Sequence, residues 1–230
     1  MTILDDLNSF SAVGLNETDE IAALTSLLDC VRATDLSALA DRVLNNKATF
    51  ESTRRFAYRH VNGFSKITLV KTDSLCLRVH VWDSVEVAAE NIHSHKWAFA
   101  SRVVVGSIGE LRFSIPNDMS PTAMEFSYVP RLDSLPGELV SQREVHLERS
   151  ENLTHEESSI YSVSTTEIHQ VRVRQVQGDL ISLVLTGNSR TKNAKVYAQL
   201  GAVPVSDRVD AALSGQDVEQ TLLKIRALSS

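Results

Sequence analysis

The spacing of hydrophobic residues divides the chain into a helical beginning, a long region of strands and a helical end. Between residues 17 and 34, apolar side chains recur at intervals of three and four after an acidic start, which predicts an amphipathic helix. These side chains are Ile21, Leu24, Leu27, Leu28 and Val31. Residues 34–46 repeat the pattern, with Thr34 or Asp35 as the expected N-cap of a second helix.

From about residue 56, short runs rich in β-branched residues replace the helical spacing. Each run has the length of one strand, and turn-forming clusters separate the runs. The predicted strands span residues 64–72, 75–82, 100–108, 110–115, 124–129, 143–149, 159–164, 168–176 and 179–187. Because no helical pattern intervenes, this region predicts an antiparallel barrel or sandwich.

The C-terminal residues return to helical spacing. We expect helices over residues 206–213 and 215–228, the second with Val218, Leu222 and Ile225 on its apolar face. The chain is therefore expected to have three parts: an N-terminal helical segment (1–55), a β-barrel (56–200) and C-terminal helices that pack on the barrel (201–230).

Composition limits the classes of function. The chain has 230 residues, of which 43% are hydrophobic, and a formal net charge of −6, which disfavours nucleic acid or an anionic membrane surface as a partner. No apolar run approaches the ~18 residues of a membrane span, and the N-terminus does not resemble a signal peptide. The two cysteines are too few for a disulfide framework. We expect a cytoplasmic protein that acts on a small molecule; its flanking helices are candidates for a homodimer interface.

Three of the seven histidines suggest a metal site. Residues 91–106, NIHSHKWAFASRVVVG, have the texture of one extended strand, on which His93 and His95 would share a face. Two neutral imidazoles so placed can bind a metal, although two solvated or hydrogen-bonded histidines are the alternative. His169 begins a distant strand with an apolar face, where it is either the third ligand or a core histidine bonded to a backbone carbonyl.

The order of these residues resembles the cupin superfamily, whose fold is a double-stranded β-helix barrel. The matching residues are His93, His95 and Gly106 in the first cupin motif and His169 in the second. The glutamate position of the first motif falls on Phe99 or Ala100, so the chain is similar to the three-histidine branch known from thiol dioxygenases such as cysteine dioxygenase. The resemblance covers roughly residues 64–189 and implies a metal held by the three histidines. Fe(II) is favoured; nickel, manganese and zinc are alternatives, because neutral imidazoles bind all of them.

The chain departs from that branch at three functional positions. The crosslinking cysteine would fall near Phe99 or Ala100, the active-site tyrosine near Thr186, and the carboxylate-binding arginine near Lys66. Lys66 can pair with a substrate carboxylate but lacks the fork of a guanidinium group. Only the metal centre, and not cysteine oxidation, is therefore carried over.

Further residues are candidates for the walls of a cavity. Trp97 and Phe99 would continue the face of the histidine pair and contact substrate, with core packing as the alternative. Arg78 and His80 would face the barrel interior, as substrate-binding or catalytic groups, if helices cover the aliphatic face of their strand; otherwise they are solvated. Tyr161 is a candidate catalytic residue acting as a donor behind the ligands, or a structural tyrosine.

Other polar residues are expected outside the site. Arg102, Arg172 and Arg174 fall on exterior faces, and no partner at ligand spacing exists for His60, His146 or His155, the last of which is expected in a loop. The long gap at residues 116–138 predicts an extended hairpin or lid.

These features predict a non-haem Fe(II) dioxygenase that oxidises a small, chelating, anionic molecule with O2. Three neutral ligands leave open coordination positions and do not compensate the charge of the metal, which favours an anionic donor from the substrate. One alternative is an isomerase or lyase that uses the ion as a Lewis acid; another is a cupin that binds a ligand without catalysis. Oxygen consumption separates the first two, and metal content separates the third.

Overall fold

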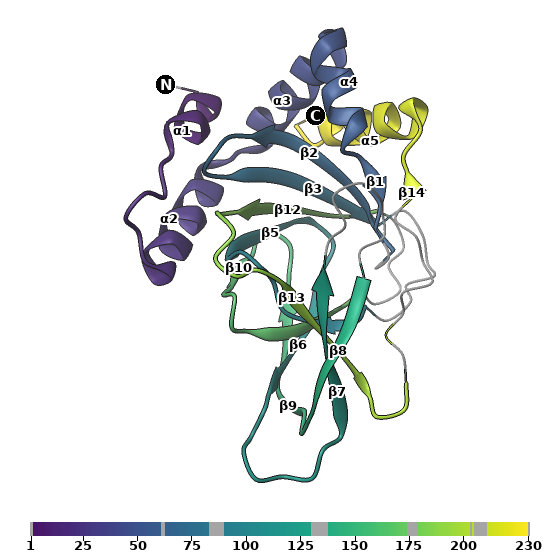
Figure 1. Cartoon of the computed structure of the whole chain (residues 1–230). Coiled ribbons are helices and arrows are strands. Elements are labelled where there is room, and N and C mark those ends of the chain that lie inside the picture. The colour runs from purple at the N-terminus through teal and green to yellow at the C-terminus, as the bar shows by residue number, and fades with distance from the viewer. Residues whose placement is uncertain are drawn as a thin grey trace.

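The computed structural model describes residues 2–60, 63–82, 90–129, 138–173, 179–202, 204 and 211–229. Over these residues it contains two antiparallel sheets, with helices gathered on the outer side of one of them (Figure 1). No helix in this part of the chain is long and apolar enough to cross a membrane.

Four helices precede the first strand and one follows the last in the described chain. They are α1 (Ile3–Ser9), α2 (Glu17–Cys30), α3 (Ala33–Asn45), α4 (Lys47–Arg55) and α5 (Gly215–Ala227). The N-cap of α3 is Arg32, and not Thr34 or Asp35 as predicted, because the Asp35 carboxylate accepts a hydrogen bond from the Arg32 backbone N–H at 2.9 Å and so occupies the third helical position.

Each sheet has seven strands. In spatial order, the first sheet contains β10 (Ile160–Val163), β5 (Phe99–Val105), β12 (Leu180–Thr186), β3 (Cys76–Trp82), β2 (Ser65–Lys71), β1 (Tyr58–Arg59) and β14 (Ala211–Ala212). The second contains β8 (Glu138–Val145), β7 (Ala123–Val129), β13 (Ala194–Gln199), β4 (Ile92–His93), β11 (Ile168–Arg172), β6 (Ile108–Ser114) and β9 (Glu148–His155).

The order of eight of these strands identifies the fold. β3, β4, β5 and β6 alternate between the two sheets, and β9, β10, β11 and β12 return beside them. As a result β3 pairs with β12, β4 with β11, β5 with both β12 and β10, and β6 with both β11 and β9. This eight-strand arrangement is the jelly roll, or double-stranded β-helix, of cupins. The predicted fold class is confirmed.

The two faces of β3 divide the hydrophobic core from the cavity. Leu77, Val79 and Val81 are fully buried in a cluster that also contains residues of α1, α2, α3 and α5. Because successive side chains of a strand point to opposite faces, Arg78 and His80 face away from these helices and into the barrel. Helices cover the aliphatic face of this strand, so the condition for the predicted interior position of Arg78 and His80 is met.

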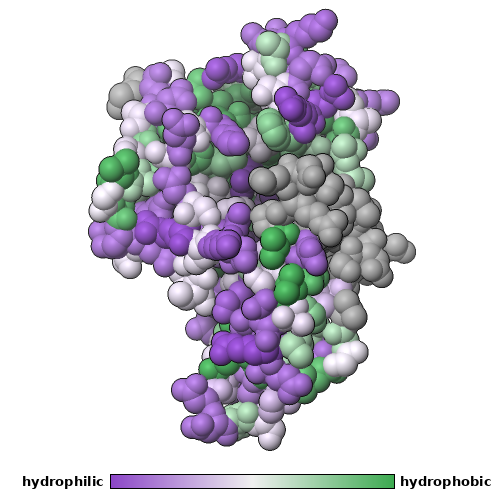
Figure 2. All heavy atoms as spheres, in the orientation of Figure 1, coloured by the Kyte–Doolittle hydropathy of each residue, from purple (hydrophilic) through white to green (hydrophobic). Residues whose placement is uncertain are grey.

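The gap at residues 116–138 contains β7, which pairs with β8 as a hairpin inserted between β6 and β9 (Figure 1). The turn of this hairpin lies outside the described residues. Side chains of β8 and β9 are mostly exposed, and the surface around them is largely hydrophilic (Figure 2). The hairpin therefore extends the second sheet beyond the barrel.

Two local predictions were wrong, and one strand was missed. Residues 143–149 are not one strand: β8 ends at Val145 and β9 begins at Glu148, although the alternation of polar and apolar residues continues through the turn. Ala211–Ala212 pairs with β1 instead of forming a helix; the preceding residues of the predicted helix lie outside the described chain. β13 was not predicted, because its sequence AKVYAQ has few β-branched residues.

Candidate metal centre and cavity

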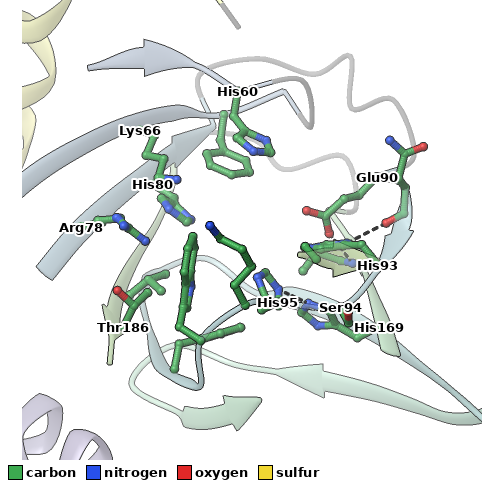
Figure 3. A pocket seen from close by; sticks show the side chains of 18 of the residues that line it. His60, Lys66, Arg78, His80, Glu90, His93, Ser94, His95, His169 and Thr186 are labelled. Atoms are coloured by element: carbon green, nitrogen blue, oxygen red, sulfur yellow. Dashed lines mark hydrogen bonds between the residues drawn. The ribbon is translucent and has the colours of Figure 1, made fainter. Parts of the chain in front are cut away.

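The structure brings His93, His95 and His169 together at one wall of the barrel interior (Figure 3). His93 and His169 are directly opposite one another on the adjacent strands β4 and β11. His95 follows β4, and its Nε2 lies 2.9 Å from Nε2 of His169. One ring nitrogen from each of the three histidines lies within 4.8 Å of the others.

The local backbone differs from the single strand predicted for residues 91–106. β4 ends at His93, the chain bends at residues 96–97, and it then enters the other sheet as β5. Ser94 ties the chain just before this bend to β13, because its N–H donates to the Lys195 carbonyl at 2.9 Å and its Oγ accepts from the Lys195 N–H at 3.1 Å. His95 therefore reaches the cluster from the segment between β4 and β5 and not from a regular strand.

Gly106 directly follows β5 and has a φ of +87°, a conformation that residues with a Cβ rarely adopt. A Cβ at this position would also lie 3.0 Å from Cδ1 of Leu180 on the neighbouring strand. The glycine at this motif position is thus required by the turn that leads from β5 to β6.

Hydrogen bonds orient two of the imidazoles. Nδ1 of His93 lies 2.9 Å from the Asn91 carbonyl, and Nδ1 of His169 lies 2.9 Å from Oε1 of Glu110. Both partners are acceptors, so each Nδ1 carries the proton and each Nε2 presents a lone pair to the cluster. Burial lowers the pKa of His93 and lowers that of His95 well below its usual range. Both rings are therefore neutral at neutral pH, the form in which imidazole binds a metal.

The donor set fits a transition-metal ion. Two imidazole nitrogens that bind one ion at about 2.1 Å and at a right angle lie roughly 3.0 Å apart. The 2.9 Å between Nε2 of His95 and Nε2 of His169 matches this separation. Three imidazoles suit iron, nickel, copper and zinc, and they do not distinguish among these metals.

Glu110 was missed by the sequence analysis, although it lies directly behind the cluster. Its side chain is fully buried, with Oε1 bound to His169 and Oε2 2.8 Å from Nε2 of His155. Burial raises the pKa of Glu110, but hydrogen bonds from His155 and His169 outweigh burial and lower it to about 2, so the carboxylate is ionised at neutral pH. The prediction that His155 lies in a loop was wrong: it is the last residue of β9.

The three histidines open onto a cavity of about 350 Å³ between the sheets. Its lining includes every residue predicted to contact substrate or assist catalysis: Lys66, Arg78, His80, Trp97, Phe99 and Tyr161. In Figure 3, Lys66, His80 and Arg78 lie together on one side of the cavity, and the three histidines lie on the other. The first group belongs to the first sheet, whereas His93 and His169 belong to the second.

Arg78 and His80 have unused hydrogen-bonding capacity on this wall. Cζ of the Arg78 guanidinium lies over the Trp97 ring, 5.2 Å from its centre, and no carboxylate among the described residues lies within ion-pair distance of it. Nε2 of His80 is buried and has no hydrogen-bond partner within the same part of the chain. Burial lowers the pKa of His80 well below its usual range, so this ring is neutral. Lys66 Nζ donates a hydrogen bond of 2.8 Å to the Tyr58 hydroxyl.

Aromatic contacts hold the remaining wall residues. Phe64 lies between the rings of His60 and His80, with centroid distances of 4.6 Å and 4.2 Å. His60 was given no role from the sequence but lines the cavity, and burial together with the Lys66 charge lowers its pKa to about 3. Phe99 meets the His95 ring edge-on at 4.8 Å.

Tyr161 lies parallel to the His155 ring at 4.0 Å, and burial raises the pKa of its hydroxyl, which is therefore protonated at neutral pH. It reaches the metal ligands through His155 and Glu110, and also through Phe99, whose ring centre lies 6.3 Å from that of Tyr161.

Of the other polar residues, Arg102, Arg172 and His146 lie away from the cluster, whereas Glu90 lies beside His93 (Figure 3). Arg102 is on the outer face of β5, where α2 covers it and its Nη1 donates to the Leu28 carbonyl at 3.3 Å. Arg172 is exposed, His146 bonds the Ser120 carbonyl, and Arg174 lies outside the described residues. Glu90, not singled out from the sequence, lines the cavity, and its carboxylate accepts from the Val171 N–H at 2.6 Å.

Comparison with known proteins finds solved structures that are similar to part of this chain at low sequence identity. No protein-family profile and no curated protein matches the sequence. Similar solved structures include the hydroxypropylphosphonic acid epoxidase of S. wedmorenis, at 12% identity over 56% of this chain and 53% of that chain, with a TM-score of 0.36. They also include an RmlC-like cupin with a double-stranded β-helix fold from Methanocaldococcus jannaschii, at 11% identity over 58% of this chain and 90% of that chain, with a TM-score of 0.33.

A third similar structure is hydroquinone 1,2-dioxygenase from Sphingomonas sp. TTNP3, at 9% identity over 53% of this chain and 64% of that chain, with a TM-score of 0.35. This chain thus spans only about half of the length of the epoxidase. The assignment of the fold rests on the strand order given above and not on these partial overlaps.

Proposed function

We propose that this protein is a metal-dependent enzyme of the cupin type, a non-haem Fe(II) dioxygenase that oxidises a small, chelating, anionic molecule with O2. The observation that carries the proposal is the cluster of His93, His95 and His169, three imidazoles at one wall of a cavity large enough for a small molecule. In a dioxygenase both atoms of O2 enter the product, so the substrate supplies the electrons and no separate reductant is required.

The three histidines would hold the metal through their Nε2 atoms, as the partners of Nδ1 on His93 and His169 indicate. Bound Fe(II) would supply the redox chemistry and the open coordination positions that O2 and a substrate donor need. Because all three ligands are neutral, the site favours a substrate that brings its own negative charge, such as a thiolate, enolate or carboxylate.

The opposite wall would bind a second anionic group of the substrate. Arg78 lies over the Trp97 ring and has no carboxylate partner in the described chain, so its N–H groups would be available for a bidentate contact. Lys66 adds positive charge on the neighbouring strand, where it is directly opposite His80. Trp97 and Phe99 would wall the bound molecule and exclude water. A substrate held at both walls is oriented for reaction before the chemistry begins.

One observation favours a second candidate, an isomerase or lyase. The neutral, buried His80 presents an unpartnered Nε2 at the cavity wall, and a proton acceptor of this kind is what an enolate-forming reaction uses. In this case the metal would act as a Lewis acid and O2 would not be consumed.

The test is an oxygen-electrode screen of Fe(II)-loaded protein with small hydroxy, thiol and keto acids, repeated in an anaerobic chamber. Consumption of one O2 per substrate, lost in the His93→Ala/His169→Ala variant, supports the dioxygenase. Turnover that runs equally well without oxygen supports the isomerase or lyase. Binding of these acids by metal-free protein, with no turnover under either condition, would favour a cupin that only binds a ligand.

A further inference from the structure

A buried carboxylate lies at the centre of three neighbouring strands, directly behind the metal ligands. Glu110 is on β6, which runs between β11 and β9, and its cross-strand partners are Val171 and Leu153. His169 and His155 are each two residues from these partners and therefore share their face of the sheet. The Glu110 carboxylate consequently lies between two imidazoles and bonds both, at 2.9 Å and 2.8 Å.

Burying a carboxylate at this position costs folding free energy that an apolar residue would not cost, which points to a functional role for Glu110. A fully buried carboxylate must be compensated by charge and hydrogen bonds, whereas an apolar residue at the same place needs neither. Ile108, two residues earlier on the same strand, shows that this face accommodates an apolar side chain. The compensation of Glu110 comes from His155, from His169 and from Arg112, whose Nε is 3.5 Å from Oε1.

We infer that Glu110, held in place by His155, is the positioning residue of the metal centre. Its carboxylate fixes His169 with the proton on Nδ1 and the lone pair of Nε2 directed at the metal, and it supplies, one layer behind the ligands, the negative charge that three neutral imidazoles lack. The inference rests on the metal site of the proposed function but not on the reaction catalysed there. A hydrogen bond from a metal-binding histidine to a carboxylate orients the ring and makes its other nitrogen a stronger ligand for the metal.

His155 holds the second oxygen of the Glu110 carboxylate, whose first oxygen is bound to His169. The His155 ring is fixed on one side by the Glu110 bond and on its face by Tyr161, at 4.0 Å with the planes 10° apart. The His155 side chain is 12% exposed, whereas that of Glu110 is fully buried. Tyr161 therefore contributes to this arrangement through its ring contact with His155.

The test is the affinity of the full-length protein for Zn²⁺ and Co²⁺, measured by competition with a chromophoric chelator. Glu110→Gln keeps the shape of the side chain but removes its charge, and we expect the affinity to fall by about 10-fold to 100-fold. The visible spectrum of bound Co²⁺ should also change, because the orientation of one ligand changes. His155→Gln leaves the carboxylate in place and should cause a smaller fall in the same direction.

The matched control is Glu125→Gln. Glu125 is a second buried glutamate of the same sheet, 4% exposed and bound to Tyr197, Arg143 and Lys195, with no contact to the histidine cluster. Its replacement should leave metal affinity and the Co²⁺ spectrum unchanged, even if stability falls.

Each outcome separates the inference from the proposed function. Unchanged metal affinity in Glu110→Gln, with the native circular dichroism spectrum, would overturn the inference while leaving the metal site intact. Failure of the unmodified protein to bind either metal would overturn both. If Glu110→Gln does not fold, His155→Gln decides: a several-fold loss of affinity supports the inference, and no loss in a folded protein refutes it.

Discussion

Replacing Glu20 by alanine should destabilise the protein through a contact that ties the N-terminal helices to the barrel. Glu20 is a fully buried residue of α2, and its carboxylate accepts hydrogen bonds from Arg190 Nε at 2.6 Å and from the Asn188 backbone N–H at 3.1 Å. These partners follow β12, at the end of a strand whose Thr186 lines the cavity. The contact therefore joins a helix of the first fifty residues to the wall of the site.

The expected loss follows from the surroundings of the carboxylate. Breaking a fully buried ion pair costs about 3–5 kcal/mol, and an unsatisfied backbone N–H costs about 1–3 kcal/mol. The Arg190 side chain is 28% exposed and can turn to water, which reduces the first figure. A Cβ on Gly187 would lie 2.1 Å from Glu20 Oε1, so the backbone is packed against the carboxylate and alanine leaves a void there. We expect a loss of about 2–4 kcal/mol in the free energy of unfolding.

The assay is urea denaturation followed by circular dichroism, with thermal unfolding as a second measure. A loss of about 3 kcal/mol lowers the Tm of a chain of this size by about 6–12 °C. The control is Glu51→Ala, which removes an exposed pair with Arg54 and should change stability by less than about 0.5 kcal/mol. A loss of equal size in both variants, or none in Glu20→Ala, would refute the reasoning.

Three further predictions concern stability at acid pH, the binding of an anionic substrate and the turn at Gly106. Burial holds the pKa of His60 at about 3, below its unfolded value of 6.5, so between these pH values the unfolded state takes up a proton and the folded state does not. The free energy of unfolding should therefore fall as the pH drops from 6.5 towards 3, by up to about 2 kcal/mol at pH 5 from this group alone. Urea titrations that show no such fall would exclude this prediction. Arg78→Gln should raise KM for an anionic substrate at least about tenfold with less effect on kcat; an equal effect on an uncharged analogue would argue against pairing with the anion. Gly106→Ala should cost about 1–3 kcal/mol because of its positive φ, measured by thermal unfolding, whereas Gly201→Ala, with a similar φ and open space around it, should cost less.

Much of the fold could be predicted because it depends on local patterns. The strands β2, β3, β5 and β12 have strong β-branched sequences, and the alternation on β3 correctly separated its aliphatic face from Arg78 and His80. The turn between β8 and β9 and the strand β13 were missed because neither has a distinctive local composition. What joins them to the sheet is pairing with distant strands, which the pattern of one segment does not encode.

The site divides in the same way. His93, His95 and His169 could be selected because their spacing and strand positions carry a signal in the sequence itself. Glu110 and His155 are 45 residues apart and become partners only through the registers of β6 with β11 and β9. By the alternation of β6, Glu110 shares a face with Ile108, Arg112 and Ser114, so no local signal marks it as buried, and the sequence does not give its partners. The position of Glu110 between His169 and His155 could be recognised only from the structure.

The central claim is that three histidines form one metal centre, and elemental analysis of anaerobically purified protein tests it most directly. The comparison is among the unmodified chain, His93→Ala/His169→Ala, and His146→Ala, whose histidine bonds a loop carbonyl away from the cluster. The account predicts about one iron per chain in the unmodified protein and in His146→Ala, and none in the double variant. Equal metal content in all three, or no metal in any after reconstitution with Fe(II), would contradict it.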